Sequence, residues 1–223
     1  MNETGGSRAL PDDPHATAVP DGEAEITLGL LAAVEENASL TQRSVAFELG
    51  IALGLANAYL KRCIRKGLIK VHHVPANRYA YYLTPIGFAE KSRLTAQYLS
   101  TSFNFFRGAR AQLGALFDDC ARRNWTRIAL VGASDLAEIA VVCAADRPVT
   151  LVGIVDPAAE VGRFAGLPVA ARLTELGRVH AVVVTDFRDP QAAYDALVAA
   201  MPPERVLTPR LLGVSRARPQ LVE

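Results

Sequence analysis

LTQRSVAFELGIALGLANAYLKRCIRKGLIKV, residues 40–71, is the stretch of sequence that decides the fold. It predicts one helix over Thr41–Leu49, whose threonine is a suitable N-cap, because a hydroxyl accepts a hydrogen bond from a free N–H of the first turn. It predicts a second helix over Leu53–Lys66. Gly50 and Gly67 follow these helices, as is typical of helix ends. Two short helices joined by a tight turn are the core of a helix-turn-helix.

The residues on either side complete the domain. Apolar residues at helical spacing predict another helix over Glu25–Asn37, and two short strands are expected at Leu68–Val71 and Tyr79–Leu83. The helix at Leu53–Lys66 is thus the third in the chain, and its inward face is expected to hold Ala56, Tyr59, Leu60 and Cys63. Three helices followed by a two-stranded ribbon predict a winged helix-turn-helix domain over residues 25–92.

The charge of the chain is unevenly distributed. The net charge is only +1, yet residues 41–93 hold nine Lys and Arg against two Asp and Glu. Residues 1–40 hold one Arg against eight acids, and residues 1–24 are expected to form a disordered acidic tail. A basic segment that coincides with a helix-turn-helix indicates a nucleic-acid partner, although a solvated basic face would carry the same charge.

The residues expected to contact double-stranded DNA follow from how this module docks. The third helix places its N-terminal outward side chains against base edges in the major groove. Asn57 is the candidate for base readout, because its amide can pair bidentately with adenine, and Lys61 is expected to meet phosphate. The start of the preceding helix is expected to contact phosphate, and the wing is expected to contact the DNA backbone or the minor groove. The predicted set is Thr41, Gln42, Arg43, Leu53, Gly54, Asn57, Ala58, Lys61, His72, His73, Asn77 and Arg78.

Residues 40–71, together with NRYAYYLTPIGFAEKSRLTAQYL at 77–99, resemble the winged-helix regulators of the MarR superfamily. The resemblance covers about residues 26–100 and is closest to the branch of exopolysaccharide-associated transcriptional regulators. It implies a homodimeric, sequence-specific DNA-binding regulator, with cell-surface polysaccharide genes as candidate targets. Members of that branch usually end soon after a long helix, whereas this chain continues.

A long helix is expected after the wing, from about Ile86 to Arg123. Apolar residues within it alternate in steps of four and three, interrupted by Arg110: Leu99, Phe103, Phe106, Leu113 and Phe117. Such a seam predicts that residues 93–125 form a linker and dimerisation helix that packs against its twin. Packing against the chain's own C-terminal domain is the alternative.

From residue 126 to the C-terminus, strands and helices alternate. The expected strands are Ile128–Val131, Leu151–Val155, Ala181–Thr185 and one near Val206–Leu207, and the expected helices are Leu136–Ala145, Leu173–Leu176 and Ala192–Met201. Apolar strands separated by helices predict a parallel sheet covered on both faces. Residues 126–223 are therefore expected to form a Rossmann-like α/β domain for ligand sensing or assembly.

RIALVGASDLAEIAVV, residues 127–142, has the layout of a strand, a tight turn and a helix that holds a dinucleotide. A glycine fingerprint at this turn bends the chain and lets the backbone approach a pyrophosphate. Here its three positions are Gly132, Ser134 and Ala137, and the Ser134 hydroxyl could itself meet a phosphate. Asp156 suits a ribose hydroxyl. The predicted cofactor-binding residues are Gly132, Ala133, Ser134, Asp135 and Asp156, with NAD(H) or a nucleotide sugar as candidate ligands. A scaffold that binds no nucleotide is the alternative.

The same run, with LVGIVDP at 151–157 and GRFAGLPV at 162–169, resembles two domain types. One heads polysaccharide-building glycosyltransferases and nucleotide-sugar dehydratases. The other is the sensor domain of the redox repressor Rex, which also follows a winged helix. The order of domains favours a regulator whose bound small molecule alters the spacing of its DNA-binding heads. A polysaccharide-biosynthesis enzyme or accessory protein that docks through the winged helix is the alternative.

Other features exclude some classes of protein. The apolar runs are too short to cross a bilayer, the N-terminus lacks signal-peptide features, and three separated cysteines have no metal-binding spacing. The α/β half has no lysine and no Tyr-x-x-x-Lys pair, and its one histidine, His180, is expected to be structural. The sequence therefore predicts a cytoplasmic protein that is not an enzyme.

Overall fold

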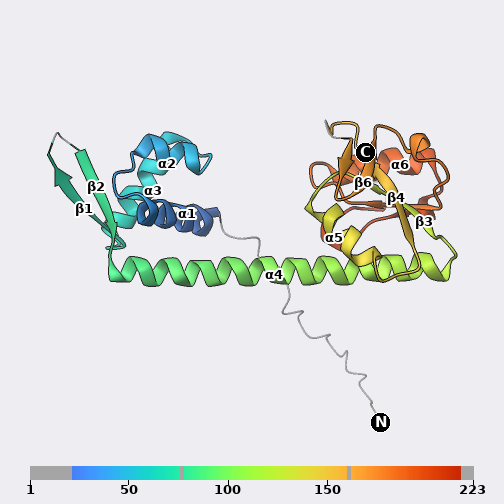
Figure 1. Cartoon of the computed structure of the whole chain (residues 1–223), viewed down its shortest axis with the longest axis horizontal. Coiled ribbons are helices and arrows are strands. Elements are labelled where there is room, and N and C mark those ends of the chain that lie inside the picture. Colours follow the sequence, from blue (N-terminus) through green and yellow to red (C-terminus); the bar gives the residue numbers. More distant parts are fainter. Residues whose placement is uncertain (1–21, 76–77, 160–161, 217–223) are drawn as a thin grey trace, which may run out of the picture. The chain divides into compact units, whose positions relative to one another are not determined.

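The computed structural model describes residues 22–75, 78–159 and 162–216 (Figure 1). It divides into two compact units, an N-terminal unit of residues 1–104 and a C-terminal unit of residues 105–223. The predicted fold class is confirmed: a winged helix, a long helix and an α/β domain follow one another along the chain. None of the helices in these described ranges is long and apolar enough to cross a membrane.

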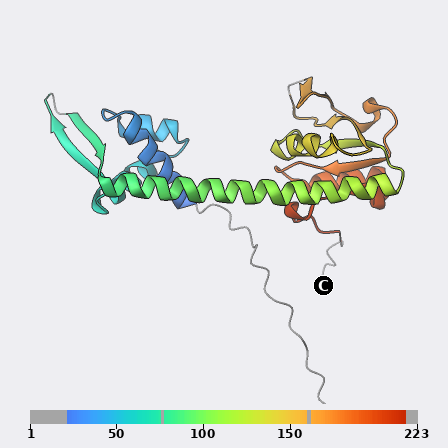
Figure 2. The ribbon, with the colours of Figure 1, turned by 60° about the horizontal axis from the view of Figure 1, so that its bottom comes forward.

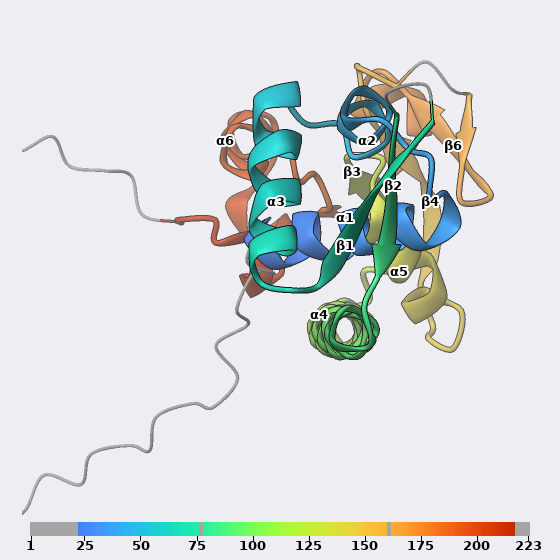
Figure 3. The same ribbon diagram turned by 90° about the vertical axis from the view of Figure 1, so that its left-hand side faces the viewer.

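The N-terminal unit has the predicted order of elements. These are α1 (Gly22–Glu36), α2 (Gln42–Glu48), α3 (Leu53–Arg65), β1 (Ile69–Val74) and β2 (Arg78–Leu83). The strands pair in an antiparallel ribbon, which lies beside α3 in Figure 3. Helix α1 begins three residues earlier than predicted, so residues 22–24 of the predicted tail are helical, and Glu23 and Glu25 in its first turn suit the helix dipole. The rest of that predicted tail lies outside the described residues.

The boundaries of α2 and α3 have local causes. Thr41 and Ser44 form a capping box, in which the Thr41 hydroxyl accepts from the Ser44 N–H at 3.1 Å and the Ser44 hydroxyl accepts from the Thr41 N–H at 2.9 Å. Gly50 and Gly67 end the two helices with φ of +62° and +70°. The predicted inward face of α3 is confirmed, because all four of its residues are buried against α1 and the ribbon.

The long helix α4 (Pro85–Arg122) starts where the wing ends. The Thr84 hydroxyl accepts a hydrogen bond from the Gly87 N–H at 3.0 Å, and proline at the first helical position needs no acceptor for an N–H. Gly87 allows the first turn to lie directly against the ribbon, because a Cβ there would be 2.0 Å from the Leu68 carbonyl oxygen. The sequence TPIG, residues 84–87, thus caps the helix at Thr84 and packs its first turn on the wing at Gly87.

The predicted dimerisation seam on α4 is wrong in its second half. Leu113 and Phe117 are completely buried in the core of their own C-terminal unit, against residues of the sheet and of its first helix. The alternative prediction, packing on the chain's own domain, is correct there. In contrast, Leu99, Phe103 and Phe106 are exposed, at 46%, 58% and 38%. The seam is therefore divided between an intramolecular core and an open surface.

The C-terminal unit contains a six-stranded sheet of order β5-β6-β4-β3-β7-β8. Its strands are β3 (Arg127–Val131), β4 (Thr150–Val155), β5 (Arg163–Phe164), β6 (Leu167–Ala170), β7 (Ala181–Val184) and β8 (Val206–Leu207). All pairs are parallel except β5–β6, which form a small antiparallel hairpin at the edge. The four predicted strands are confirmed, and this hairpin was not predicted because its strands are short and lack a buried apolar run.

Helices cover both faces of this sheet. They are α5 (Asp135–Ala144) and α6 (Pro190–Ala200), with short 3₁₀ turns at Leu173–Leu176, Pro203–Arg205 and Arg210–Leu212. The second half of α4 and α5 pack on the face that presents Leu130 and Val183, and α6 packs on the face that presents Val182 and Val184. Figure 2 shows the unit from the side on which α4 passes. The arrangement agrees with the prediction of a covered parallel sheet.

Candidate nucleic-acid interface

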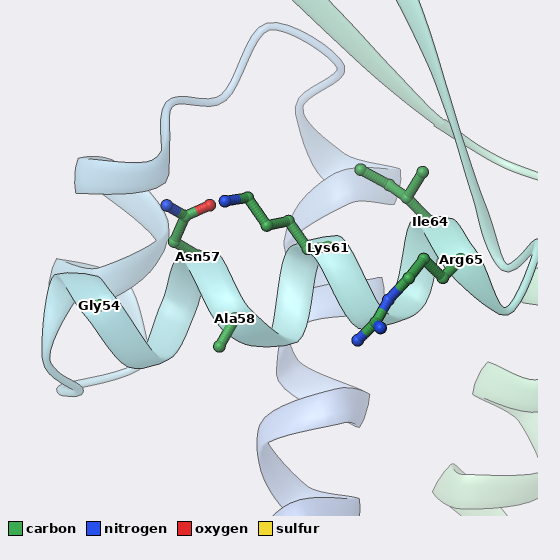
Figure 4. Close-up of a pocket in the computed structure, with 6 residues that line it drawn as sticks. All are labelled: Gly54, Asn57, Ala58, Lys61, Ile64 and Arg65. Carbon is green, nitrogen blue, oxygen red and sulfur yellow. The ribbon is translucent and has the colours of Figure 1, made fainter.

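The outward face of α3 forms an open groove of about 650 Å³ in the N-terminal unit. Figure 4 shows the residues that line it: Gly54, Asn57, Ala58, Lys61, Ile64 and Arg65. They recur at helical spacing over three turns, so they form one stripe opposite the buried stripe of the same helix. Four of the predicted DNA-binding residues, Gly54, Asn57, Ala58 and Lys61, are brought together here.

The cationic side chains of α3 differ in their partners. Lys61 and Arg65 are exposed, and neither forms an ion pair within the part of the chain that the structure describes. Their neighbour Arg62 differs, because its Nη1 lies 2.9 Å from Glu23 of α1. The hydrogen bond from Arg62 lowers the pKa of Glu23, and the same bond raises the pKa of Arg62. Of these three cations, Lys61 and Arg65 are therefore the ones available to an external anion.

Asn57 lies at the centre of the groove and is half-buried. Its Oδ1 is inaccessible to solvent and has no hydrogen-bond partner among the described residues. Figure 4 shows its amide beside the Lys61 side chain, one turn along the helix. Gly54 and Ala58 have little or no side chain, so another molecule could approach the helix backbone closely on this side. This face therefore bears one amide and two cations, which are the kinds of group that contact base edges and phosphates in protein–DNA complexes.

The start of α2, predicted to meet phosphate, is partly engaged within the fold. The Thr41 hydroxyl caps the helix, so its side chain is used internally. Gln42 hydrogen-bonds to Tyr81 of the ribbon. Burial raises the pKa of the Tyr81 hydroxyl, while the bond to Gln42 opposes that rise. Arg43 is exposed and forms no ion pair with any described residue, so of these three side chains it is the one available to a phosphate.

The wing presents aromatic side chains in pairs. His72 meets Tyr82 edge to face at 5.6 Å between ring centroids, and His73 meets Tyr79 in the same way at 5.4 Å. All four side chains are exposed. Asn77 lies outside the described residues, and for Arg78 only its place at the start of β2 is described. The wing's predicted contact with DNA stays a prediction.

Two exposed residues of the helix-turn-helix were not predicted from the sequence. Phe47 on α2 is 89% exposed, and Arg65 lies on the outward side of α3. Arg65 could have been found, because it lies seven residues after Ala58 on the same helical stripe. Phe47 had no such signal, since a phenylalanine in an amphipathic helix is usually assigned to the core.

The predicted cofactor residues meet at the carboxyl ends of the strands in the C-terminal unit. Asp156 follows β4, and its Oδ2 accepts from the Ala133 N–H at 3.0 Å and from Arg188 at 2.7 Å. Its Oδ1 accepts from the Ala158 N–H at 3.0 Å. Burial raises the pKa of Asp156, but the hydrogen bonds from Arg188 and the two backbone N–H groups outweigh burial and lower it below its ordinary value.

The Ser134 hydroxyl, predicted as a possible phosphate contact, is engaged elsewhere. It donates to the Thr185 carbonyl oxygen at 2.6 Å and also caps α5 by accepting from the Ala137 N–H at 3.4 Å. Gly132 has φ of +100°, and a Cβ there would lie 2.5 Å from the Cα of Asp186. The bend predicted at Gly132 is thus confirmed, and it packs tightly on the loop after β7.

His180 has the structural role that the sequence predicted. Its Nδ1 accepts from the N–H groups of Thr126 and Arg127, at 3.1 and 3.3 Å, where β3 begins. It lies at the amino ends of the strands, opposite the edge that holds Asp156. Among the described residues, no three His, Cys, Asp or Glu side chains gather as a metal site would require.

Comparison with known families identifies the module that presents this interface. Residues 23–70 match the family model described as winged helix-turn-helix DNA-binding. The match extends from α1 to the start of β1 and so includes the whole outward face of α3. The N-terminal unit therefore has a winged helix-turn-helix fold, and residues 23–70 are similar to DNA-binding domains of that kind. No curated protein matches the chain.

Several solved structures are similar to parts of the chain. The PcaV transcriptional regulator from Streptomyces coelicolor is 25% identical over 44% of this chain and 74% of its own, with a TM-score of 0.36. A MepR variant from S. aureus, bound to an oligodeoxyribonucleotide, is 25% identical over 37% and 61%, with a TM-score of 0.31. The S-adenosylmethionine-dependent methyltransferase SibL is 18% identical over 83% and 60%, with a TM-score of 0.26. Because these TM-scores are low, the assignment of the domain rests on the family model.

Proposed function

We propose that this protein is a dimeric transcription regulator that binds double-stranded DNA through α3, with genes for cell-surface polysaccharide as its targets. The observation that carries the proposal is the open face of α3 within a matched winged helix-turn-helix domain. On that face Lys61 and Arg65 would meet phosphate, and Asn57 would meet a base edge once its buried Oδ1 turns outward. The resemblance of residues 26–100 to MarR-superfamily regulators supports the same function and supplies the class of target genes.

The exposed cations on α3 give the proposal its physical basis. A protein that neutralises phosphates releases condensed counterions, so Lys61 and Arg65 would each add to affinity and to its dependence on salt. Arg62, one residue from Lys61, faces Glu23 and would add neither. The expected contribution of a cation therefore depends on which side of the helix carries it.

The test measures DNA binding by two matched double variants. Sequencing the DNA that co-purifies with the protein supplies the fragment, and fluorescence anisotropy then gives Kd across a series of salt concentrations. Lys61→Ala with Arg65→Ala is expected to weaken binding at least about tenfold and to flatten the salt dependence by about one unit of slope for each phosphate that is no longer neutralised. Arg62→Ala with Arg93→Ala removes the same charge from two ion-paired residues and is the control.

Two outcomes would contradict the assigned surface. One is unchanged binding by the Lys61 and Arg65 variant. The other is an equal loss in the control, which would mean that net charge, and not this face, determines affinity. Co-purified DNA that is not enriched near polysaccharide genes would refute the proposed targets while leaving the DNA-binding surface intact.

The proposed dimer uses the open part of α4. Leu99 and Phe103 are exposed large apolar residues one turn apart in the N-terminal unit, and Tyr98 beside them is 45% exposed. Exposed apolar side chains at this spacing are typical of a helix that packs against a second copy. Two copies would also present two α3 helices to a two-fold symmetric site.

Light scattering after size exclusion tests the dimer. The wild-type chain is expected to elute with twice the mass of one chain, and Leu99→Glu with Phe103→Glu is expected to elute as a monomer with unchanged circular dichroism. Gln97→Glu adds charge on the opposite side of the same helix and should leave the dimer intact. A wild-type monomer, or a dimer that survives in the double variant, would refute this interface.

A further inference from the structure

The carboxyl edge of the sheet in the C-terminal unit is where a Rossmann-like fold holds a nucleotide. Strand β3 has β4 on one side and β7 on the other, so the winding direction of the sheet reverses there. In open α/β sheets, ligands bind outside the carboxyl ends of the strands at such a switch point. Three loops meet at this edge: the turn 132–135 after β3, Asp156 after β4, and residues 185–188 after β7.

A pyrophosphate fits poorly at the first of these loops. Its close approach requires a glycine at the second position of the turn, which here is Ser134. The Ser134 hydroxyl is turned away to the Thr185 carbonyl oxygen, and it caps the N–H of Ala137. In addition, the first turn of α5 carries Asp135 and Glu138, so an incoming anion would meet two carboxylates at the helix N-terminus.

A ribose fits no better, because the Asp156 carboxylate already has its partners. Both oxygens accept hydrogen bonds, from Arg188 and from the backbone N–H groups of Ala133 and Ala158. The Asp156 side chain is only 2% exposed. Arg188 also pairs with Asp186 at 3.2 Å, which fixes its guanidinium between the two carboxylates. A sugar hydroxyl would have to displace this ion pair.

The loops after β3 and β7 are joined directly as well. The Thr185 hydroxyl donates to the Gly132 carbonyl oxygen at 2.7 Å, and Thr185 itself is completely buried. Gly132 lies so close to Asp186 that no side chain would fit between them. The loop after β3 is therefore bonded to the loops after both of its neighbouring strands, β4 and β7, which leaves no space for a ligand between them.

We infer that Ser134, Asp156, Thr185 and Arg188 form a latch that ties the three loops together, and that this edge binds neither a dinucleotide nor a nucleotide sugar. The side chains that would bind such a ligand are hydrogen-bonded to one another and to the neighbouring loops instead. The α/β unit therefore has no free ligand-binding groups among these four residues. The inference does not depend on DNA binding, since all four residues belong to the C-terminal unit.

Ligand binding by the full chain tests the first part of the inference. NADH, NADPH and UDP-glucose are each added at about 5 mM, a hundred times a Kd of about 50 µM, which would stabilise the folded state measurably. No change in unfolding temperature is expected, and no slowing of amide hydrogen exchange over residues 132–138. Stabilisation together with slowed exchange in that segment would overturn the inference. Stabilisation without it would place the ligand elsewhere and leave the inference standing.

Hydrogen exchange in two arginine variants tests the latch itself. Arg188→Ala removes one partner of Asp156, so exchange over residues 132–138 is expected to accelerate several-fold. Arg172→Ala is the control, because Arg172 forms an exposed ion pair with Glu175 at 2.9 Å in the same unit. Unchanged exchange in Arg188→Ala, or equal acceleration in the control, would overturn the latch.

Discussion

The outward face of α3 and the carboxyl edge of the α/β sheet both gather polar and charged side chains, but they differ in what those side chains contact. On α3, Lys61 and Arg65 are exposed cations without ion pairs among the described residues. At the sheet edge, Asp156 and Arg188 satisfy one another and the neighbouring loops. The first surface has groups available to a partner, and the second uses its groups to hold the fold.

The difference shows how a site that binds can be separated from one that only resembles a site. A charged side chain that is free to bind a ligand is solvated by water. A buried carboxylate must have hydrogen-bond partners within the protein, because burying a charge without partners costs free energy. Residue types alone therefore do not define a site. The partners of those residues do.

The largest effect is expected for Gly132→Ala at the closed edge. It imposes a φ of +100° on a residue with a Cβ and places that Cβ against the backbone of Asp186. We expect a loss of about 2 to 5 kcal/mol in the free energy of unfolding, measured by chemical denaturation. Gly166→Ala is the control, because Gly166 has φ of +81° and no described atom near its Cβ position. Equal losses in both variants would mean that packing on Asp186 contributes nothing.

The second effect is expected for Asp156→Asn. The change weakens the hydrogen bonds to Arg188 and to two backbone N–H groups of a nearly buried side chain. A loss of about 2 to 4 kcal/mol is expected in the C-terminal unit. DNA affinity should be unchanged at a temperature where the variant remains folded. A variant as stable as wild type would refute the closed edge as a source of stability.

Acid pH should reduce the loss of stability that Asp156→Asn causes. The folded state lowers the pKa of Asp156, so its contribution is complete above the unfolded-state pKa, near pH 4, and is lost as pH falls through the lower folded-state value. The difference in unfolding temperature between wild type and Asp156→Asn is therefore expected to be largest at pH 7 and to shrink at pH 3. A difference that is constant over this range would show that the charge of Asp156 is unimportant.

The smallest effect is expected for Gly54→Ala on α3. No atom of the described residues lies within 4 Å of the Cβ position, so the fold should be unchanged or stabilised by up to about 1 kcal/mol. DNA affinity is expected to fall a few-fold, since the added methyl group would lie on the surface that is proposed to contact the duplex. Unchanged affinity would place Gly54 outside the contact and would move the interface toward Lys61.

Much of the architecture could be predicted from local patterns. The capped start of α2, the buried stripe on α3 and the apolar strands of the sheet all follow from spacing and from Thr, Gly and Val at particular positions. The β5–β6 hairpin was missed because its short strands show no periodicity. On α4, residues of one apolar pattern end in different environments, since Phe117 is buried within its unit and Phe103 is exposed.

The sequence alone determined where most helices and strands lie, that residues 41–93 form a basic segment, and that a winged helix precedes an α/β domain. These follow from neighbouring residues, whose propensities and spacing act over a few turns of chain. Only the tertiary structure decided that Arg62 is paired while Lys61 is not, and that Asp156 and Ser134 face inward. Those outcomes depend on residues 23, 185 and 188, distant in the chain, which folding alone brings within hydrogen-bond distance.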